Sequence, residues 1–395
     1  MSESVHTARW IEQIVEQGWD LHLFAATESR PHSALRQITV HSFYKYPHHT
    51  NDESLRQTGA TYPLRRGATT LRRVAERTLP THWSASARLA RLISQLKPDI
   101  IHSLEMQRAG YLTMDAFCAS SIPPATPWIY SCWGNDLFNF AGQAQHAPRI
   151  RAVLSRCNYL IADCRRDVAL AHQNGFQGEV LGVLPVGGGF EIEKMRDLLR
   201  PKNPSKRNLI LIKGYQHQTW GGRALVALEA IERCAETLRS YEIVIYSACE
   251  TVRGRAQDIA KEKGLRLRVI PPVMHSEIIA LMAQARIALG VSVSDGVPNT
   301  MLEAMTMGAF PIQSDTGSTA EWIVHGKNGL LVPPEDAGAI SRAIERALED
   351  DNLVDEAATL NLDLVSRIDR RKVQQQAIDI YNYVYTKSKS SVAGQ

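Results

Sequence analysis

Two carboxylate side chains, Asp295 and Glu303, frame a short turn with the composition of an anion-binding site. Residues 296–299 (Gly-Val-Pro-Asn) are typical of a turn, and residues 300–307 are predicted to begin a helix. Pro298 suits a helix entrance because its φ is fixed and its missing N–H is not needed there. The first amides of such a helix are unpaired and carry the positive end of its dipole, so they attract anions. On spacing alone, an ordinary strand-to-helix crossover with an incidental acid explains the pattern equally well.

Buried strands and amphipathic helices are predicted around this turn. Short apolar runs at 208–213, 242–247 and 287–292 are typical of parallel strands covered on both faces. Residues 223–238 keep a helical period between the first two runs. In the first half of the chain, strands are also predicted at 97–103 and 128–132. Because ligands in open α/β sheets lie at the carboxyl ends of the strands, the turns after these two strands are expected to point toward one crevice.

The turn and the residues after it resemble the donor-sugar motif of family-4 glycosyltransferases, which are retaining enzymes of the two-lobed GT-B fold. That motif has an acid, seven further residues, and then Glu followed by Ala-Met. Here it reads Asp295…Glu303-Ala-Met, and the similarity continues through 307–321 and 326–336. One position departs from the family pattern, because the first acid is usually Glu and Asp295 is one methylene shorter.

The resemblance implies a role for each residue of the motif. Glu303 would accept hydrogen bonds from the ribose hydroxyls of a nucleotide sugar, and Asp295 with the backbone of 296–300 would hold the sugar. Retention without an enzyme nucleophile implies same-face attack, in which the leaving phosphate takes the proton of the acceptor. The residues implied to bind the donor are Gly214, Gly296, Val297, Pro298, Asn299, Thr300, Leu302 and Glu303, and those implied in catalysis are Lys213, Arg223, Asp295 and Asp136.

Two cations are candidates for the diphosphate of the donor. After the first strand of the second lobe, the family usually shows Gly-Arg and then, several residues later, Lys-Gly. After the corresponding strand at 208–213, this chain has Lys213-Gly214 first and Arg223 later. Two phosphates need about two positive charges where no metal binds, which favours a functional role for both residues. The structural alternative is that Lys213 ends its own strand and Arg223 only begins a helix.

The first half of the chain is predicted to be a second α/β lobe. A helix over 5–17 ends at Gly18 and is followed by a strand over 21–26, which resembles the first helix and second strand of the family. In the family a strand and a glycine-rich turn precede this helix. Either the start of the chain is placed too late to include them, or this lobe lacks that edge strand. Later, the turn Trp133-Gly-Asn-Asp136 resembles a family turn that often carries His, and His102 is either a structural histidine or a substrate contact.

A basic stretch over 45–85 contains arginines at 56, 65, 66, 72, 73 and 77. Such a run is either a solvated helix face or a cationic rim that attracts an anionic or membrane-bound acceptor.

We expect an α/β protein of two doubly wound, Rossmann-like lobes, because 395 residues exceed one ordinary core. The expected domains are an acceptor-binding lobe (1–187), a nucleotide-sugar-binding lobe (188–372), and a crossing helix with the tail (373–395). The turn around Pro185 and the three glycines that follow it is the expected hinge.

Composition excludes several classes of protein. No apolar run is long enough to span a membrane, and a net charge of +4 is too slight to indicate nucleic-acid binding. The six cysteines lack C-x-x-C spacing, and no Asp-x-Asp occurs, so we expect neither a disulfide framework nor a metal site. A cytoplasmic location is expected, with peripheral contact at the inner face of the membrane left open.

The predicted function is metal-independent, retaining transfer of a sugar from a nucleotide sugar to a glycan or lipid-linked acceptor, in surface polysaccharide or glycolipid synthesis. No cofactor is expected, because the nucleotide sugar is a substrate. Two alternatives stay open: a glycan-binding or scaffolding protein that has lost catalysis, and a sugar-nucleotide epimerase on the same fold.

Overall fold

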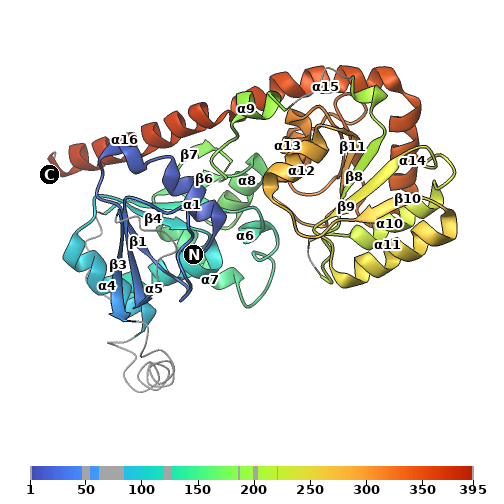
Figure 1. The fold of residues 1–395 in the computed structure, drawn as a ribbon. Helices are drawn as coiled ribbons and strands as arrows, with labels where there is room; N and C mark the ends of the chain where they lie inside the picture. Colours follow the sequence, from blue (N-terminus) through green and yellow to red (C-terminus); the bar gives the residue numbers. More distant parts are fainter. Residues whose placement is uncertain are drawn as a thin grey trace. The chain divides into compact units, whose positions relative to one another are not determined.

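A computed structural model describes residues 2–46, 54–61, 84–119, 126–185, 187–198, 203–219 and 221–393. The chain forms two compact units (Figure 1). Unit 1 comprises Met1–Gly189 and Arg370–Gln395, and unit 2 is the continuous segment Phe190–Asp369.

Unit 2 contains one parallel sheet of six strands in the order β10-β9-β8-β11-β12-β13. Its strands are β8 (Leu209–Lys213), β9 (Glu242–Tyr246), β10 (Arg266–Val269), β11 (Ala285–Gly290), β12 (Phe310–Ser314) and β13 (Leu330–Val332). The central strands are apolar on both faces, and β8, β9 and β11 are buried almost throughout. This is the pattern of a sheet covered on both sides.

Helices cover both faces of this sheet. The helices of unit 2 are α9 (Ile192–Arg196), α10 (Ala224–Arg233), α11 (Glu250–Lys263), α12 (His275–Met282), α13 (Asn299–Thr306), α14 (Ala337–Glu349) and α15 (Asp351–Val365). One face of the sheet packs against α10, α11 and α14, and the opposite face packs against α12 and the buried side of α13. The unit is therefore doubly wound.

Unit 1 contains two parallel sheets, with the orders β1-β2-β3 and β4-β5-β6-β7. Their strands are β1 (His22–Phe24), β2 (Ile38–Lys45), β3 (Leu55–Thr61), β4 (Ile101–Leu104), β5 (Trp128–Cys132), β6 (Tyr159–Ala162) and β7 (Glu179–Val183). Within the described ranges, β1 pairs only with β2, and β4 pairs only with β5.

The helices of unit 1 lie on both sides of the four-stranded sheet. They are α1 (Val5–Glu12), α4 (Ala85–Leu96), α5 (Tyr111–Ala119), α6 (Asn135–Phe138), α7 (Ala147–Arg156), α8 (Arg165–Gln173) and α16 (Arg370–Ala393). Figure 1 shows α16 as a long helix at the C-terminus. Its apolar side chains Ala377, Ile380 and Val384 pack with Trp10 of α1 against β5 and β6.

The expected fold class is confirmed: both units are α/β with parallel sheets, and the C-terminal helix returns to the first lobe. The division between the units falls at Gly189/Phe190 rather than 187/188, because Phe190 donates its amide to Ile368 O and forms a bridge with Asp369, both in unit 2. Similarly, α16 begins at Arg370 rather than 373. Most of the basic stretch over 45–85 lies outside the described residues.

The predicted first helix is shorter than expected. Its α-helical part ends at Glu12, a 3-10 turn covers Val15–Gln17, and Gly18 follows with φ of 70°. The apolar side chains of this segment are buried, namely Trp10, Ile11, Ile14 and Val15. No helix in the described part of the chain is long and apolar enough to cross a membrane.

Candidate active site

The two loops that carry the predicted donor residues leave the same edge of the unit 2 sheet. Strands β8 and β11 are parallel neighbours, so their carboxyl ends are adjacent. Lys213 ends β8, and the loop after β11 contains Asp295. This loop then enters α13, for which Pro298 is the N-cap residue with φ of −66°.

Hydrogen bonds from two neighbouring segments, the end of β12 with the residues after it and the loop after β8, fix the loop that holds Asp295. Ser292 donates its amide to Ser314 Oγ at 2.9 Å, and Thr316 Oγ1 donates to Ser292 O at 2.5 Å. Val293 donates its amide to Gly221 O at 3.0 Å, which joins this loop to the one after β8. Ser318 Oγ donates to Gly296 O at 2.9 Å. The loop is therefore held on both sides.

Gly317 allows the closest of these approaches. Its φ of +74° lies in the left-handed region, and a Cβ there would stand 2.2 Å from Asp295 O. Any larger residue would push the turn away from β12. Asp295 itself is half-buried, and its Oδ1 accepts the amide of Gly296 at 2.9 Å.

Glu303 is a buried carboxylate one turn into α13. Its side chain is 4% exposed, and His275 Nε2 lies 2.7 Å from its Oε1. Tyr246, at the end of β9, is a second ionisable group near Glu303. Burial, followed by the charge of Glu303, raises the pKa of the Tyr246 phenol, and a hydrogen bond with Thr300 opposes the shift. A buried carboxylate needs such donors, because an unpaired charge in the interior is costly.

Lys213 and Gly214 have different environments at the end of β8. The Lys213 ammonium lies 6.0 Å from the centroid of the Tyr215 ring, and no carboxylate in the described ranges forms an ion pair with it. Gly214 is buried, and a Cβ there would lie 2.7 Å from Ile245 Cγ2. Gly214 therefore allows the loop to cross β9 closely, and Lys213 remains available to an anion.

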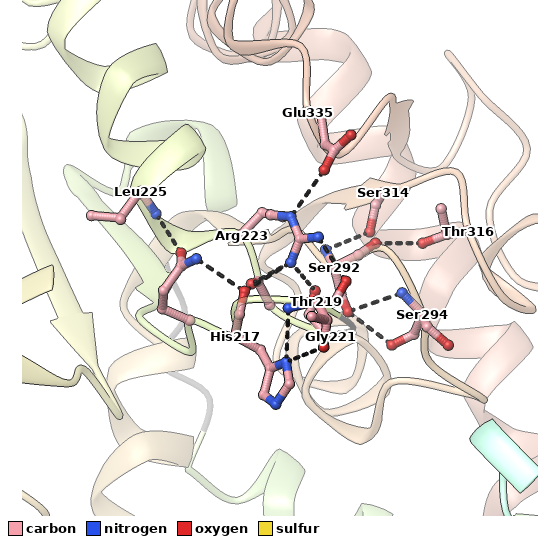
Figure 2. A network of polar contacts seen from close by, with 12 residues as sticks. His217, Thr219, Gly221, Arg223, Leu225, Ser292, Ser294, Ser314, Thr316 and Glu335 are labelled. Atoms are coloured by element: carbon pink, nitrogen blue, oxygen red, sulfur yellow. Dashed lines mark hydrogen bonds and ion pairs between the residues drawn. The ribbon is translucent and has the colours of Figure 1, made fainter. Parts of the chain in front are cut away.

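Arg223 is committed to its own loop (Figure 2). Its side chain is 12% exposed, and its Nε donates to Glu335 Oε1 at 3.1 Å. The remaining donors reach backbone carbonyls of the loop after β8, namely those of His217 at 3.0 Å, Thr219 at 3.0 Å, Gly222 at 3.3 Å and Gly221 at 3.4 Å. A guanidinium has five N–H groups, and nearly all of them are used here. The geometry favours the structural alternative for Arg223.

The remaining predicted donor residues divide between surface and core. Asn299 and Thr300 open α13 and are partly exposed, and Val297 is also partly exposed. Leu302 is fully buried in a core cluster with Phe190 and Val365.

Asp136 of unit 1 braces a turn from within. The residue is 3% exposed, and its Oδ2 accepts the amides of Met106 at 2.9 Å and Trp133 at 3.0 Å, together with the Tyr130 hydroxyl at 2.9 Å. Burial and then the charge of Glu105 raise the pKa of this carboxyl well above its usual range, although the three donors oppose the shift. Asp136 thus combines structural contacts with the raised pKa that a proton donor needs.

The turn that Asp136 braces is also held from α8. Arg166 donates to Gly134 O at 2.7 Å, and its guanidinium lies 4.3 Å from the centroid of the Phe138 ring. The same side chain pairs with buried Asp167 at 2.8 Å. The Trp133–Asp136 segment is therefore held by contacts from both β5 and α8.

His102 has the structural role. Its Nδ1 lies 2.7 Å from the Tyr381 hydroxyl and its Nε2 lies 2.8 Å from Ser131 Oγ, while Trp10 Nε1 donates to the same tyrosine at 2.9 Å. Burial lowers the pKa of His102 to about 3, so the imidazole is neutral. These contacts join β4 and β5 to α16 rather than to the loop that follows β4.

Comparison with known proteins identifies the chain. A family model described as glycosyl transferase 4-like matches residues 1–164, and a second, described as glycosyl transferases group 1, matches residues 209–350. The chain is a glycosyltransferase of the GT-B fold. No curated protein sequence matches it.

Solved structures share the fold of this glycosyltransferase at low sequence identity. Sucrose-phosphate synthase from Thermosynechococcus elongatus is 15% identical, with a TM-score of 0.67 over 97% of this chain and 93% of that one. Anabaena HepE in complex with UDP and glucose is 15% identical, with a TM-score of 0.62 over 92% and 99%. A glycosyltransferase from Rickettsia africae is 13% identical, with a TM-score of 0.63 over 97% and 95%.

Two side chains of this glycosyltransferase site were missed by sequence reasoning. His275 and Tyr246 approach Glu303 from α12 and β9. The sequence could have placed His275 at the start of a helix, because Glu277 is at the position from which its side chain can cap the amide of Met274. Nothing local marks Tyr246, which reads as an ordinary strand residue.

Proposed function

We propose that this glycosyltransferase transfers a sugar from a nucleoside diphosphate sugar to a glycan or lipid-linked acceptor, with retention of configuration. The observation that carries the proposal is that Lys213 and Asp295 follow neighbouring strands at one edge of the unit 2 sheet, and that Glu303 lies one turn into the helix that begins there. These side chains supply acceptors for hydroxyl groups and a cation for phosphate. Solved structures of HepE contain UDP, UDP-glucose, or UDP with glucose, which supports a donor of this class.

The proposed roles follow the chemistry of each group. Glu303 accepts hydrogen bonds from the ribose, and Asp295 with the backbone of 296–300 accepts and donates to the sugar hydroxyls. Lys213, with the first amides of α13, stabilises the negative charge that grows on the leaving diphosphate. Arg223 acts indirectly by holding the loop after β8, which is a change from the role implied by the family resemblance.

The proposed reaction is a single displacement on one face of the sugar. The acceptor hydroxyl oxygen forms a bond to the anomeric carbon while the bond from that carbon to the β-phosphate oxygen breaks. The leaving diphosphate takes the electron pair of that bond and accepts the proton of the hydroxyl. We propose that unit 1 binds the acceptor around Trp133–Asp136, and the hydrogen bonds that hold this turn and its buried acid support this choice.

The biological setting is proposed from the resemblance alone. Family-4 enzymes suggest a cytoplasmic enzyme of surface polysaccharide or glycolipid synthesis, in peripheral contact with the inner face of the membrane.

The decisive experiment measures release of nucleoside diphosphate from a panel of nucleotide sugars, with and without glycan acceptors. We expect one donor to be cleaved, and NMR of the product should show the anomeric configuration of that donor. Binding of donors without release of diphosphate would support a scaffold that has lost catalysis. Interconversion of the donor sugar would support an epimerase.

We also predict that chelation leaves the activity nearly unchanged, because the proposed site neutralises the diphosphate with Lys213 and helix amides. The described ranges contain no group of three His, Cys, Asp or Glu residues that could hold a metal. The measurement is turnover before and after EDTA treatment. A collapse of turnover that Mn²⁺ restores would overturn this account of the leaving group.

A further inference from the structure

His275 is in an unusual position for an exposed histidine. It is the first residue of α12, its side chain is 55% exposed, and yet its Nε2 lies 2.7 Å from a carboxylate that is only 4% exposed. Helix α12 packs beside α13, which carries that carboxylate. The imidazole therefore bridges solvent and the buried end of Glu303.

The contact uses only one oxygen of Glu303. A carboxylate offers about four lone-pair sites on its two oxygens. Within the described part of the chain, His275 bonds to Oε1 of Glu303, and no hydrogen bond is made to Oε2. Oε2 is not among the fully buried polar atoms that lack a partner, so this oxygen is not completely enclosed. A ligand hydroxyl can therefore reach Glu303 without displacing His275.

The other groups at Glu303 do not replace His275. Tyr246 lies at the end of β9 and engages Thr300, and its pKa is raised by burial and by the charge of Glu303. The phenol therefore stays protonated and does not add negative charge to the site. His275 remains the one side chain that the described ranges place in direct hydrogen-bond contact with Glu303.

We propose that His275 is a positioning residue of the donor site: it holds Oε1 of Glu303 so that Oε2 faces the ribose hydroxyls of the nucleotide. The inference rests on the proposed function, because it assigns the ribose to Glu303. Loss of His275 leaves a buried carboxylate without its donor, so that the carboxylate turns toward water and loses its fixed direction. A surface ion pair of ordinary kind would have no such effect on a ligand.

The proposal predicts that a change at His275 affects the binding of a nucleotide only through its ribose hydroxyls. His275→Ala should weaken binding of a nucleoside diphosphate about tenfold, which corresponds to roughly 1.4 kcal/mol. Binding of the 2′,3′-dideoxy form of the same nucleotide should change less than about threefold, because that ligand has no hydroxyl for Oε2. His275→Gln keeps a side-chain N–H donor and should retain most of the affinity.

The experiment is calorimetric titration of the full-length chain with UDP, GDP and ADP, followed by the dideoxy form of whichever binds most tightly. His325→Ala is the matched control, since His325 is an exposed histidine of unit 2 that caps the amide of Leu331. This control should bind both ligands as the wild type does. Melting temperatures of all variants show that each is folded.

Several results would overturn the inference. Unchanged affinity in His275→Ala would make the contact a surface pair, and tighter binding would make His275 a competitor of the ribose. Equal losses for the two nucleotides would place His275 at the base or the phosphates. Failure of the wild type to bind any nucleoside diphosphate is a different outcome, because it would overturn the proposed function itself.

Discussion

At the scale of single residues, the environments of Lys213 and Arg223 differ although both are cations at the end of β8. Arg223 satisfies four backbone carbonyls and Glu335, whereas Lys213 contacts only an aromatic ring within the described ranges. Removing Arg223 leaves acceptors unsatisfied, which costs about 1–3 kcal/mol. Removing Lys213 leaves no such group.

We therefore predict opposite phenotypes for two alanine variants. Lys213→Ala should weaken binding of the free nucleoside diphosphate about tenfold or more at an unchanged melting temperature. Arg223→Ala should lower the melting temperature, with any loss of binding following from the disordered loop. Arg233→Ala serves as the control, since this exposed arginine on α10 pairs with Glu229 on the surface of the same helix. A stable Arg223→Ala with lost diphosphate binding would restore the role that the family resemblance implies.

A second prediction at this scale concerns Asp295. Its carboxylate should face the sugar rather than the nucleotide, because the residue precedes the turn that leads into α13. Asp295→Asn should leave affinity for the free nucleoside diphosphate unchanged and lower turnover of the intact donor at least about tenfold, or roughly 1.4 kcal/mol of transition-state stabilisation. Calorimetry and steady-state kinetics on one preparation test this. Equal losses in both would place Asp295 at the phosphates or in the fold.

Sequence reasoning found the residues that lie close together along the chain and missed the pairs that do not. The turn from Asp295 to Glu303 was predicted because its residues are local. The contact of Glu303 with His275 spans 28 residues, and that of Arg223 with Glu335 spans 112. Such pairs depend on which strands are neighbours, and no local pattern encodes this.

At the scale of elements, the strands and helices around the site were predictable because both faces of each sheet are covered. The apolar run before Asp295 became β11, and the helix predicted after it became α13. Helix α10 ends at Arg233 rather than at 238. The residues after it form turns, such as the one in which Leu238 donates its amide to Ala235 O at 3.2 Å, while Cys234, Ala235 and Leu238 keep the apolar period by packing in the core. The periodicity of apolar residues therefore predicted where helices and strands occur better than it predicted where they end.

The junction of β4, β5 and α16 gives a prediction about pH. An unfolded histidine has a pKa of about 6.5, whereas that of His102 in the fold is about 3. Between these values the unfolded chain binds one more proton than the folded chain, so the free energy of unfolding falls as the pH falls, by up to about 1.4 kcal/mol per pH unit. The neutral variant His102→Gln should lack this contribution.

Urea unfolding between pH 4 and 7, followed by tryptophan fluorescence, measures this difference. Trp10 and Trp128 are buried in unit 1 and report on its unfolding. The wild type should lose stability more steeply than His102→Gln as the pH is lowered from about 6.5. Parallel curves for the two proteins would show that His102 is protonated in the fold and that its contacts with Tyr381 and Ser131 differ from those described.

At the scale of the whole molecule, the two units differ in how many segments of the chain they contain: unit 1 is built from two segments and unit 2 from one. Unit 1 needs both ends of the chain, since α16 packs with α1 and the four-stranded sheet. Unit 2 is one continuous segment with cores on both faces of its sheet. Its two ends meet, because Phe190 donates its amide to Ile368 O at 2.9 Å and bridges to Asp369.

We predict from this that residues 190–369 fold when expressed alone and bind the nucleoside diphosphate, whereas residues 1–189 without α16 do not fold. All side chains proposed to contact the donor, including Glu303, Asp295 and Lys213, belong to unit 2, and so does the positioning residue His275. The isolated unit should therefore show a cooperative thermal transition that the nucleotide raises, with an affinity within about tenfold of that of the full chain and no transferase activity. Differential scanning calorimetry and nucleotide titration of the fragment measure both properties, and the same fragment carrying Lys213→Ala is the control. A folded fragment that binds no nucleotide would show that unit 1 supplies a donor contact, and the assignment of the donor to unit 2 would then be wrong.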